Sequence, residues 1–252
     1  MRITFLGTGT STGNPEIGCR CEVCTSQDPR DRRLRASVLV ETDNTRILID
    51  CGPDFRQQML PLDFRKIDGV LITHEHYDHV GGLDDLRPFV KFGDVDLYGE
   101  DFVLETIQRR IPYSFAKNRY PGTPSFELHT INPDEAFRIA GETIIPIRVM
   151  HAKLPIFGYR IGHFAYLTDV KYIPEEELAK LEGLEVLVID ALRHTEHISH
   201  ITMNESLEYI KRIQPKTAYL IHMSHQIGLH KEVEKVLPQD VSLSYDGLVI
   251  EL

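Results

Sequence analysis

The feature that most constrains this chain is a run of four metal-ligand-type side chains directly after an apolar strand. Residues 73–82 have the sequence T-H-E-H-Y-D-H-V-G-G and follow the apolar segment G-V-L-I. Side chains two apart on an extended segment point the same way, so His74 and His76 can bind one ion. Asp78 and His79 then face a neighbouring position, where a carboxylate and an imidazole suit a second divalent ion. The alternative is a solvated histidine-rich loop, but the alternation and the Gly-Gly turn favour a metal site.

Further residues of ligand type end other apolar segments. His151, Asp169 and His222 each follow a predicted strand, and Asp50 closes one more. One histidine in such a place is more often structural, but an ordered set at strand ends is hard to produce by chance. Asp50 is a candidate to accept a hydrogen bond from a ligating imidazole. An ordinary turn carboxylate would have the same sequence context.

The four cysteines divide into a cluster and a single residue. Cys19, Cys21 and Cys24 fall within six residues, while Cys51 stands apart. This spacing is poor for a disulfide framework and good for a metal clip. Surface thiols that happen to cluster are the alternative.

Strands alternate with helices along the whole chain. Apolar patterns predict strands at 3–6, 37–41, 46–50, 69–73, 95–98, 137–139, 143–150, 157–161, 164–168, 185–189, 218–221 and 248–252. Helical periodicity covers 83–90, 101–110, 175–181, 204–213 and 230–236. No linker or low-complexity tract interrupts this order, so residues 1–252 are expected to form one domain. The glycine pattern at 6–13 mimics a nucleotide-binding loop, but no helix follows it, so we expect it to line the metal site.

Composition narrows the class of partner. The 252 residues carry a formal charge of -10, which repels phosphate backbones and makes a nucleic-acid partner unlikely by charge alone. Small anionic substrates remain compatible, because a bound metal pair reverses the local field. The sequence shows no signal peptide and no apolar segment of membrane-spanning length, so a cytoplasmic protein without membrane contact is expected.

The motifs resemble those of a known superfamily. The H-x-H-x-D-H run is similar to the signature of the metallo-β-lactamase superfamily. The segments L-G-T-G-T-S-T-G, G-C-R-C-E-V-C, F-G-Y-R and H-M-S-H-Q extend the resemblance over essentially the whole chain, toward the PhnP-type cyclic ribosyl phosphate phosphodiesterases. The resemblance implies an αββα four-layer sandwich, in which two mixed β-sheets pack face to face with helices outside. It also implies a dinuclear metal site along one edge of the sheets.

The resemblance assigns roles to the ligand-type residues. The first metal would be held by His74, His76 and His151, and the second by Asp78, His79 and His222, with Asp169 bridging them. Two such ions, manganese or zinc, can share a hydroxide that acts as nucleophile. One structural zinc would be held by Cys19, Cys21, Cys24 and His225. Three thiolates and one imidazole form a closed site, which would pin the zinc-clip loop around 13–35.

The resemblance also places a general acid. Within H-T-E-H-I-S-H, His200 matches the residue that protonates the leaving group, with a capping or loop role as its alternative. His200 and Asp78 are the residues expected to take part in catalysis. His194 and His197 lie where the chain departs from the family pattern, so they receive no role. Lys153 is a candidate contact for a substrate phosphate.

The expected function is hydrolysis of a small, cyclic ribosyl or nucleotide phosphodiester. Two alternatives stay open: a nuclease similar to the transfer-RNA maturation endonucleases, and a non-catalytic zinc-stapled protein similar to pyrroloquinoline quinone biosynthesis protein B. A thiolester or lactam hydrolase would not be expected to carry the cysteine cluster. A flavodiiron reductase would need a flavin-binding domain for which no residues remain. Neither the leaving group nor the active-site metals follow from these residues. Superfamily members often form homodimers, but no feature here establishes one.

Overall fold

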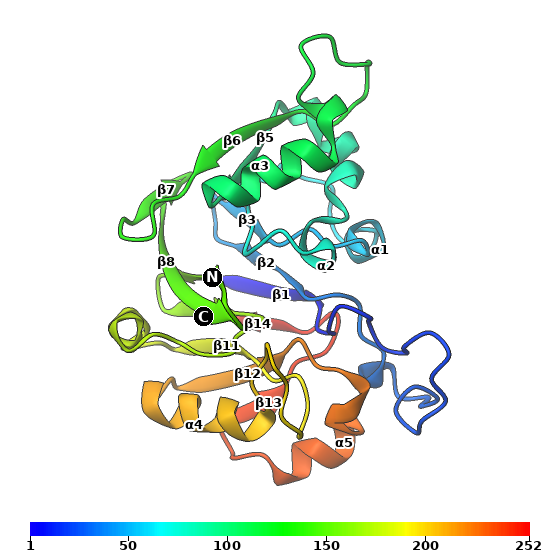
Figure 1. Cartoon of the computed structure of the whole chain (residues 1–252), viewed down its shortest axis with the longest axis vertical. Coiled ribbons are helices and arrows are strands. Elements are labelled where there is room, and N and C mark those ends of the chain that lie inside the picture. The colour runs from blue at the N-terminus through cyan, green and yellow to red at the C-terminus, as the bar shows by residue number, and fades with distance from the viewer.

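The computed structural model describes residues 1–252 and contains two seven-stranded β-sheets packed face to face (Figure 1). The first sheet has the order β14-β1-β2-β3-β4-β5-β6, with β14 (Val249–Glu251), β1 (Arg2–Gly7), β2 (Ser37–Glu41), β3 (Arg46–Ile49), β4 (Gly69–Leu71), β5 (Val95–Gly99) and β6 (Phe126–Thr130). The second has the order β13-β12-β11-β10-β9-β8-β7, with β13 (Val241–Leu243), β12 (Thr217–Ile221), β11 (Val186–Asp190), β10 (Phe164–Leu167), β9 (Leu154–Ile161), β8 (Glu142–His151) and β7 (Phe137–Ile139).

Each sheet is antiparallel on one side and parallel on the other. In the first sheet β14, β1, β2 and β3 pair antiparallel, while β3 to β6 pair parallel. In the second sheet β7 to β10 pair antiparallel, while β10 to β13 pair parallel. The predicted mixed sheets are therefore confirmed.

Alternating side chains divide the core into three apolar layers. Along β2, Val38 and Val40 face the second sheet, whereas Leu39 faces the helices that cover the first sheet. Successive strand residues point to opposite faces, so a strand of continuous apolar residues must be covered on both sides. A third cluster joins the outer face of the second sheet to its own helices. The αββα sandwich expected from the resemblance is the observed architecture.

The helices lie on the outer faces of the two sheets (Figure 1). The α-helices are α1 (Phe55–Met59), α2 (Tyr77–Val80), α3 (Asp101–Arg110), α4 (Met203–Ile213) and α5 (His230–Val233). The helices predicted at 83–90 and 175–181 are 3₁₀ helices, Leu83–Phe92 and Glu175–Leu181. Pro88 within the first removes a backbone donor and opposes regular α-helical bonding there. Helix α4 begins with a capping box, in which Thr202 and Glu205 bond each other's backbone N–H groups.

Several short elements were absent from the sequence prediction. Strands β6 and β13 and helix α1 lie in segments that we did not assign. The metal-ligand run, expected to be a loop throughout, contains the single-turn helix α2. The longest α-helix, α4, has 11 residues, and no helix is long and apolar enough to cross a bilayer.

Candidate metal centre

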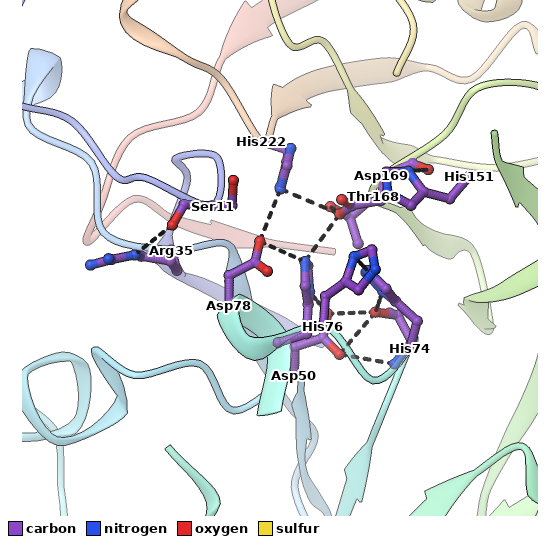
Figure 2. Close-up of polar contacts among 12 residues, drawn as sticks. Ser11, Arg35, Asp50, His74, His76, Asp78, His151, Thr168, Asp169 and His222 are labelled. Atoms are coloured by element: carbon purple, nitrogen blue, oxygen red, sulfur yellow. Dashed lines mark hydrogen bonds and ion pairs between the residues drawn. The ribbon is translucent and has the colours of Figure 1, made fainter. Parts of the chain in front are cut away.

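The candidate centre lies at the edge where strands of both sheets end (Figure 2). Asp50 follows β3, Asp169 follows the residue after β10, and His222 follows β12. All three have left-handed backbone conformations, with φ of 61°, 56° and 59°. Such a conformation costs about 1–3 kcal/mol for a non-glycine residue and persists only where the surrounding structure imposes it. The backbone turns sharply at each strand end, and this turn directs each side chain into the centre.

Four buried side chains meet in one cluster: Asp78, His79, Asp169 and His222. His79 Nε2 lies 3.2 Å from Oδ2 of Asp78 and 3.2 Å from Oδ2 of Asp169. His222 Nε2 lies 3.5 Å and 3.4 Å from the same two oxygens. Donor atoms bonded to one tetrahedral zinc-sized ion lie about 3.3–3.5 Å apart. The spacing therefore fits a divalent cation between these four atoms.

Unpaired nitrogens support this fit. Nε2 of His79 and Nε2 of His222 are buried without a hydrogen-bond partner. Buried polar atoms are normally paired, because an unpaired one loses its hydration without compensation. A metal ion would complete the coordination of both nitrogens.

A second cluster consists of His74, His76 and His151, whose ligand atoms lie within 4.8 Å of one another. His74 Nε2 is 2.9 Å from His76 Nδ1. The ring centroid of His151 lies 5.6 Å from that of His74 and 5.2 Å from that of His76. The structure thus brings together all seven residues proposed from the sequence. Asp169 lies between the two clusters (Figure 2).

Asp50 and Thr73 hold the histidines from behind. Asp50 Oδ2 accepts from Nδ1 of His79 at 2.7 Å. The hydroxyl of Thr73 donates to Asp50 at 2.9 Å and accepts from Nδ1 of His74 at 3.0 Å. Such partners fix which ring nitrogen faces the metal and how the ring is turned. Both rings therefore direct Nε2 into the centre.

The pKa shifts divide the candidate ligands. Burial opposes protonation of His79, but the negative charges of Asp78, Asp169 and Asp50 raise its pKa well above the usual value, so a bound metal would have to displace that proton. Burial lowers the pKa of His74 well below its usual value and that of His151 to about 4. Burial raises the pKa of Asp169, but the charges of His222 and His79 outweigh it and hold that pKa well below its usual value. Neutral imidazoles and ionised carboxylates are the forms that bind metals.

His200 lies beside the candidate metal ligands His151, Asp169 and His222, and its ring is paired with the carboxylate of Asp190. Its Nδ1 donates to Oδ2 of Asp190 at 3.0 Å, and its Nε2 lies 3.8 Å from Oδ1 of Asp169. Asp190 is completely buried at the end of β11, and its other oxygen is 3.9 Å from Nδ1 of His222. We did not single out Asp190 from the sequence. The available signal was an acidic residue directly after a wholly apolar strand, the pattern that marked Asp50 and Asp169.

Two glycines allow the ligand segments to approach each other. A Cβ atom on Gly52 would collide with the carbonyl oxygen of Asp78. A Cβ atom on Gly82 would collide with the carbonyl oxygen of Gly52. The turn after β3 therefore packs directly against α2, which places Asp50 behind His79.

The cysteine cluster forms a separate site on the surface loops. Sγ of Cys21 and of Cys19 lie 3.3 Å and 3.7 Å from Nδ1 of His225, and Cys24 completes the group. Burial opposes ionisation of Cys21, but hydrogen bonds from the Cys24 backbone and from His225 lower its pKa to about 6. A thiolate at neutral pH is the form that binds zinc.

Other residues considered from the sequence lie outside both sites. Lys153 is exposed in the turn between β8 and β9, two residues from His151, and its role as a phosphate contact stays a prediction. Tyr159 is completely buried, and its hydroxyl donates to Ile72 O at 2.5 Å, so it has a packing role. In the loop at 6–13, the backbone N–H of Thr10 donates to the carbonyl oxygen of Met223, the residue after His222, at 3.1 Å.

Comparison with known proteins identifies the family. The model of the Beta-lactamase superfamily domain matches residues 45–223. The chain belongs to the beta-lactamase superfamily. The crystal structure of a diphosphatase from the PhnP family matches with a TM-score of 0.92 and 40% sequence identity. The match covers 100% of this chain and 97% of the diphosphatase chain. The present chain therefore belongs to the PhnP family, which confirms the resemblance found in the sequence.

Two further relatives qualify this assignment. An octanoyltransferase of Porphyromonas gingivalis is 48% identical over 250 residues, which are 98% of this chain and 51% of that protein. The present chain thus spans about half the length of the octanoyltransferase. Zinc-bound PqqB from Methylobacterium extorquens shares the fold, with a TM-score of 0.81 at 21% identity and full coverage of both chains. The chain therefore has the metallo-β-lactamase fold, and its His and Asp clusters are of the kind that could hold metal ions.

Proposed function

We propose that the protein is a dinuclear metal-dependent phosphodiesterase that acts on a small, cyclic ribosyl or nucleotide phosphodiester. The observation that carries this proposal is a set of four donor atoms with N···O distances of 3.2–3.5 Å, which lies beside His200 and its partner Asp190. The similarity to a PhnP-family diphosphatase supports phosphorus chemistry.

Seven side chains would hold the two ions, manganese or zinc. One group consists of His74, His76 and His151, the other consists of Asp78, His79 and His222, and Asp169 contacts both. When bound, the ions supply Lewis acidity and lower the pKa of a water molecule. The protein's own contribution is to fix the ring orientations through Asp50, Thr73 and Ser199, so that little reorganisation accompanies the reaction.

His200 supplies the proton for the departing oxygen. Asp190 accepts from Nδ1 of this ring. Burial raises the pKa of Asp190 and lowers that of His200, so the acid requires an ionised Asp190 to stabilise the protonated imidazole. The second ring proton then lies on Nε2, which faces Asp169 and the centre. As a water oxygen bonds to phosphorus and the bond from phosphorus to the leaving oxygen breaks, this proton moves to the leaving oxygen. In a cyclic diester that oxygen becomes a hydroxyl of the ring-opened phosphomonoester.

The paired acid favours a phosphodiester over a thiolester. A thiolate, with a pKa of about 8.5, leaves without protonation, whereas an alkoxide does not. A buried His–Asp pair beside the metal ligands would therefore have little use in thiolester cleavage. The octanoyltransferase relative nevertheless makes an octanoyl thiolester the second candidate substrate.

The cysteine site is proposed to hold one structural zinc. Cys19, Cys21, Cys24 and His225 complete a tetrahedral set with no position left for substrate. The clip joins the loop after β1 to the segment that follows His222. Zinc there would stabilise the position of that ligand segment.

The test is turnover by manganese- or zinc-loaded protein on a panel of substrates. The panel contains a cyclic ribosyl phosphate, a cyclic nucleotide, a linear aryl diester, precursor transfer RNA and an octanoyl thiolester. We expect the highest kcat/KM on a cyclic diester and no turnover by the Asp169→Asn variant. Turnover confined to the thiolester or to the RNA would overturn the proposal.

A further inference from the structure

A histidine beside the general acid has no role in the proposed reaction. The ring of His197 is half-buried, and its centroid lies 5.1 Å from that of His200. The ring of His200 in turn lies 4.9 Å from that of His222 and 4.7 Å from that of His151. His197 is therefore the next ring outward from the candidate metal centre, beyond the proposed acid His200.

Hydrogen bonds fix the tautomer of this ring. The backbone N–H of Ser199 donates to Nδ1 of His197 at 3.3 Å. Because a backbone N–H can only donate, Nδ1 is the acceptor, and the Ser199 hydroxyl, 3.2 Å from the same atom, also donates to it. The ring proton consequently lies on Nε2. Burial and the positive charges of His200 and Arg193 lower the pKa of His197, which favours the neutral ring.

Ser199 orients a second histidine at the same time. Its carbonyl oxygen accepts from Nδ1 of His151 at 2.9 Å, on the ring proposed to bind the first metal. One residue thus sets the direction of a ligand ring and of His197. Both hydrogen bonds of the His197 ring go to Nδ1, so its Nε2–H is free to meet a substrate.

We propose that His197 is a substrate-binding residue that donates its Nε2–H to an oxygen of the leaving group close to the departing oxygen. This inference rests on the proposed phosphodiesterase function. His200 delivers its proton to the departing oxygen, so the adjacent ring meets atoms attached to that oxygen. His197 therefore selects leaving groups with a neighbouring hydroxyl, ether or phosphate oxygen, as in a sugar phosphate.

Such a donor acts through specificity. A site that hydrogen-bonds a substrate oxygen discriminates against an analogue without that oxygen, because the bound analogue shields this half-buried donor from water without pairing it. Nζ of Lys171 lies 3.3 Å from the carbonyl oxygen of His200, and its charge is partly balanced by Glu205 at 3.8 Å. An oxygen-bearing leaving group fits a donor at His197 better than a bare alkyl group.

The test compares two five-membered cyclic phosphodiesters, a cyclic ribosyl phosphate and ethylene phosphate. The second has the same reacting ring and no additional oxygens. In His197→Phe we expect kcat/KM to fall about 10–100-fold on the ribosyl ester and to stay within about twofold on ethylene phosphate. His197→Gln, whose amide N–H replaces Nε2–H, should recover part of the loss. Equal losses on both esters, or no loss on either, would overturn the inference.

A second readout does not depend on turnover. Long-range ¹H–¹⁵N spectra should show the Nε2–H tautomer of His197, and an Nδ1–H tautomer would contradict the proposal. His194→Gln serves as the matched control, because His194 bonds the carbonyl oxygen of Ile227, away from the centre. If the wild type cleaves neither ester, the phosphodiesterase proposal fails. If it cleaves both and His197→Phe does not distinguish them, only the role of His197 fails.

Discussion

The cysteine clip and the proposed dinuclear centre are both clusters of ligand-type residues, but the structure builds them differently. The clip draws three ligands from one surface loop and a fourth from a short 3₁₀ helix, and two of its cysteines are only half-buried. The dinuclear centre draws its ligands from the ends of strands in both sheets and from α2, and six of its seven ligands are buried. Sulfur ligands close the first site, whereas carboxylates and imidazoles next to a paired acid surround the second.

The two clusters differ in backbone strain. At the centre, Asp50, Asp169 and His222 have left-handed backbones, a cost that the two packed sheets impose. None of the four clip ligands has a positive φ. A strained, pre-arranged site suits catalysis, because its groups need not reorganise during the reaction. An unstrained site on loops suits stabilisation, because metal binding itself orders the loops.

The first prediction breaks the centre and leaves the clip intact. Asp169→Asn removes the charge shared by both clusters while keeping the side-chain shape, so kcat/KM on a cyclic diester should fall about 10⁴-fold. Metal analysis should show loss of the active-site ions and retention of the clip zinc. Activity within about tenfold of the wild type would contradict the role of Asp169 as a shared ligand.

The second prediction concerns the acid beside the centre. His200→Gln should lower kcat about 10²–10³-fold on an alkyl leaving group, because that oxygen needs a proton. On a p-nitrophenyl ester the loss should be below about tenfold, since p-nitrophenolate departs without protonation. Steady-state kinetics on both esters measures the difference. Equal losses would show that His200 does not act as the acid.

The third prediction tests the residue behind the acid. Asp190→Asn should lower kcat about 10–100-fold, because the amide cannot stabilise a protonated His200. The loss should again be larger for the alkyl leaving group. The matched variant Asp96→Asn removes a partly exposed carboxylate paired with His129 and should leave kcat unchanged. A similar loss in both variants would indicate a general effect on folding.

The smallest effect on chemistry is expected at the clip. Cys21→Ser should abolish one zinc site and lower stability by about 4 kcal/mol, which corresponds to a Tm loss of about 8–16 °C. At about 25 °C the folded variant should retain kcat within about threefold of the wild type. Thermal unfolding and turnover on the same sample measure both. A Tm within about 2 °C of the wild type corresponds to a stability change below about 1 kcal/mol and would argue against a stabilising zinc.

Local patterns predicted most of the scaffold because strand residues buried on both faces are continuously apolar. Strand β2 and helix α3 were predicted with the observed bounds. Strand β6 was missed although its sequence F-E-L-H-T alternates apolar and polar residues, as a strand at the edge of a sheet can; five residues give only a short pattern. The 3₁₀ character of Leu83–Phe92 depends on Pro88 and on packing, which helical periodicity does not show.

The sequence indicated the candidate ligands, His200 and one supporting residue, Asp50, which accepts from His79. His74, Asp169 and His222 are of ligand type in an ordered set, which a sequence can display. Asp190 and Ser199 act through hydrogen bonds to rings that lie 10 and 48 residues away along the chain. Such partners become visible only when the fold brings them together.

The central claim is that strand ends of both sheets hold a pair of divalent ions separate from the clip. The most direct test is the metal content per chain of the wild type and of Asp169→Asn, measured by mass spectrometry of metals after gel filtration. The account predicts about three ions in the wild type and about one in the variant. About one ion per chain in both proteins would contradict it.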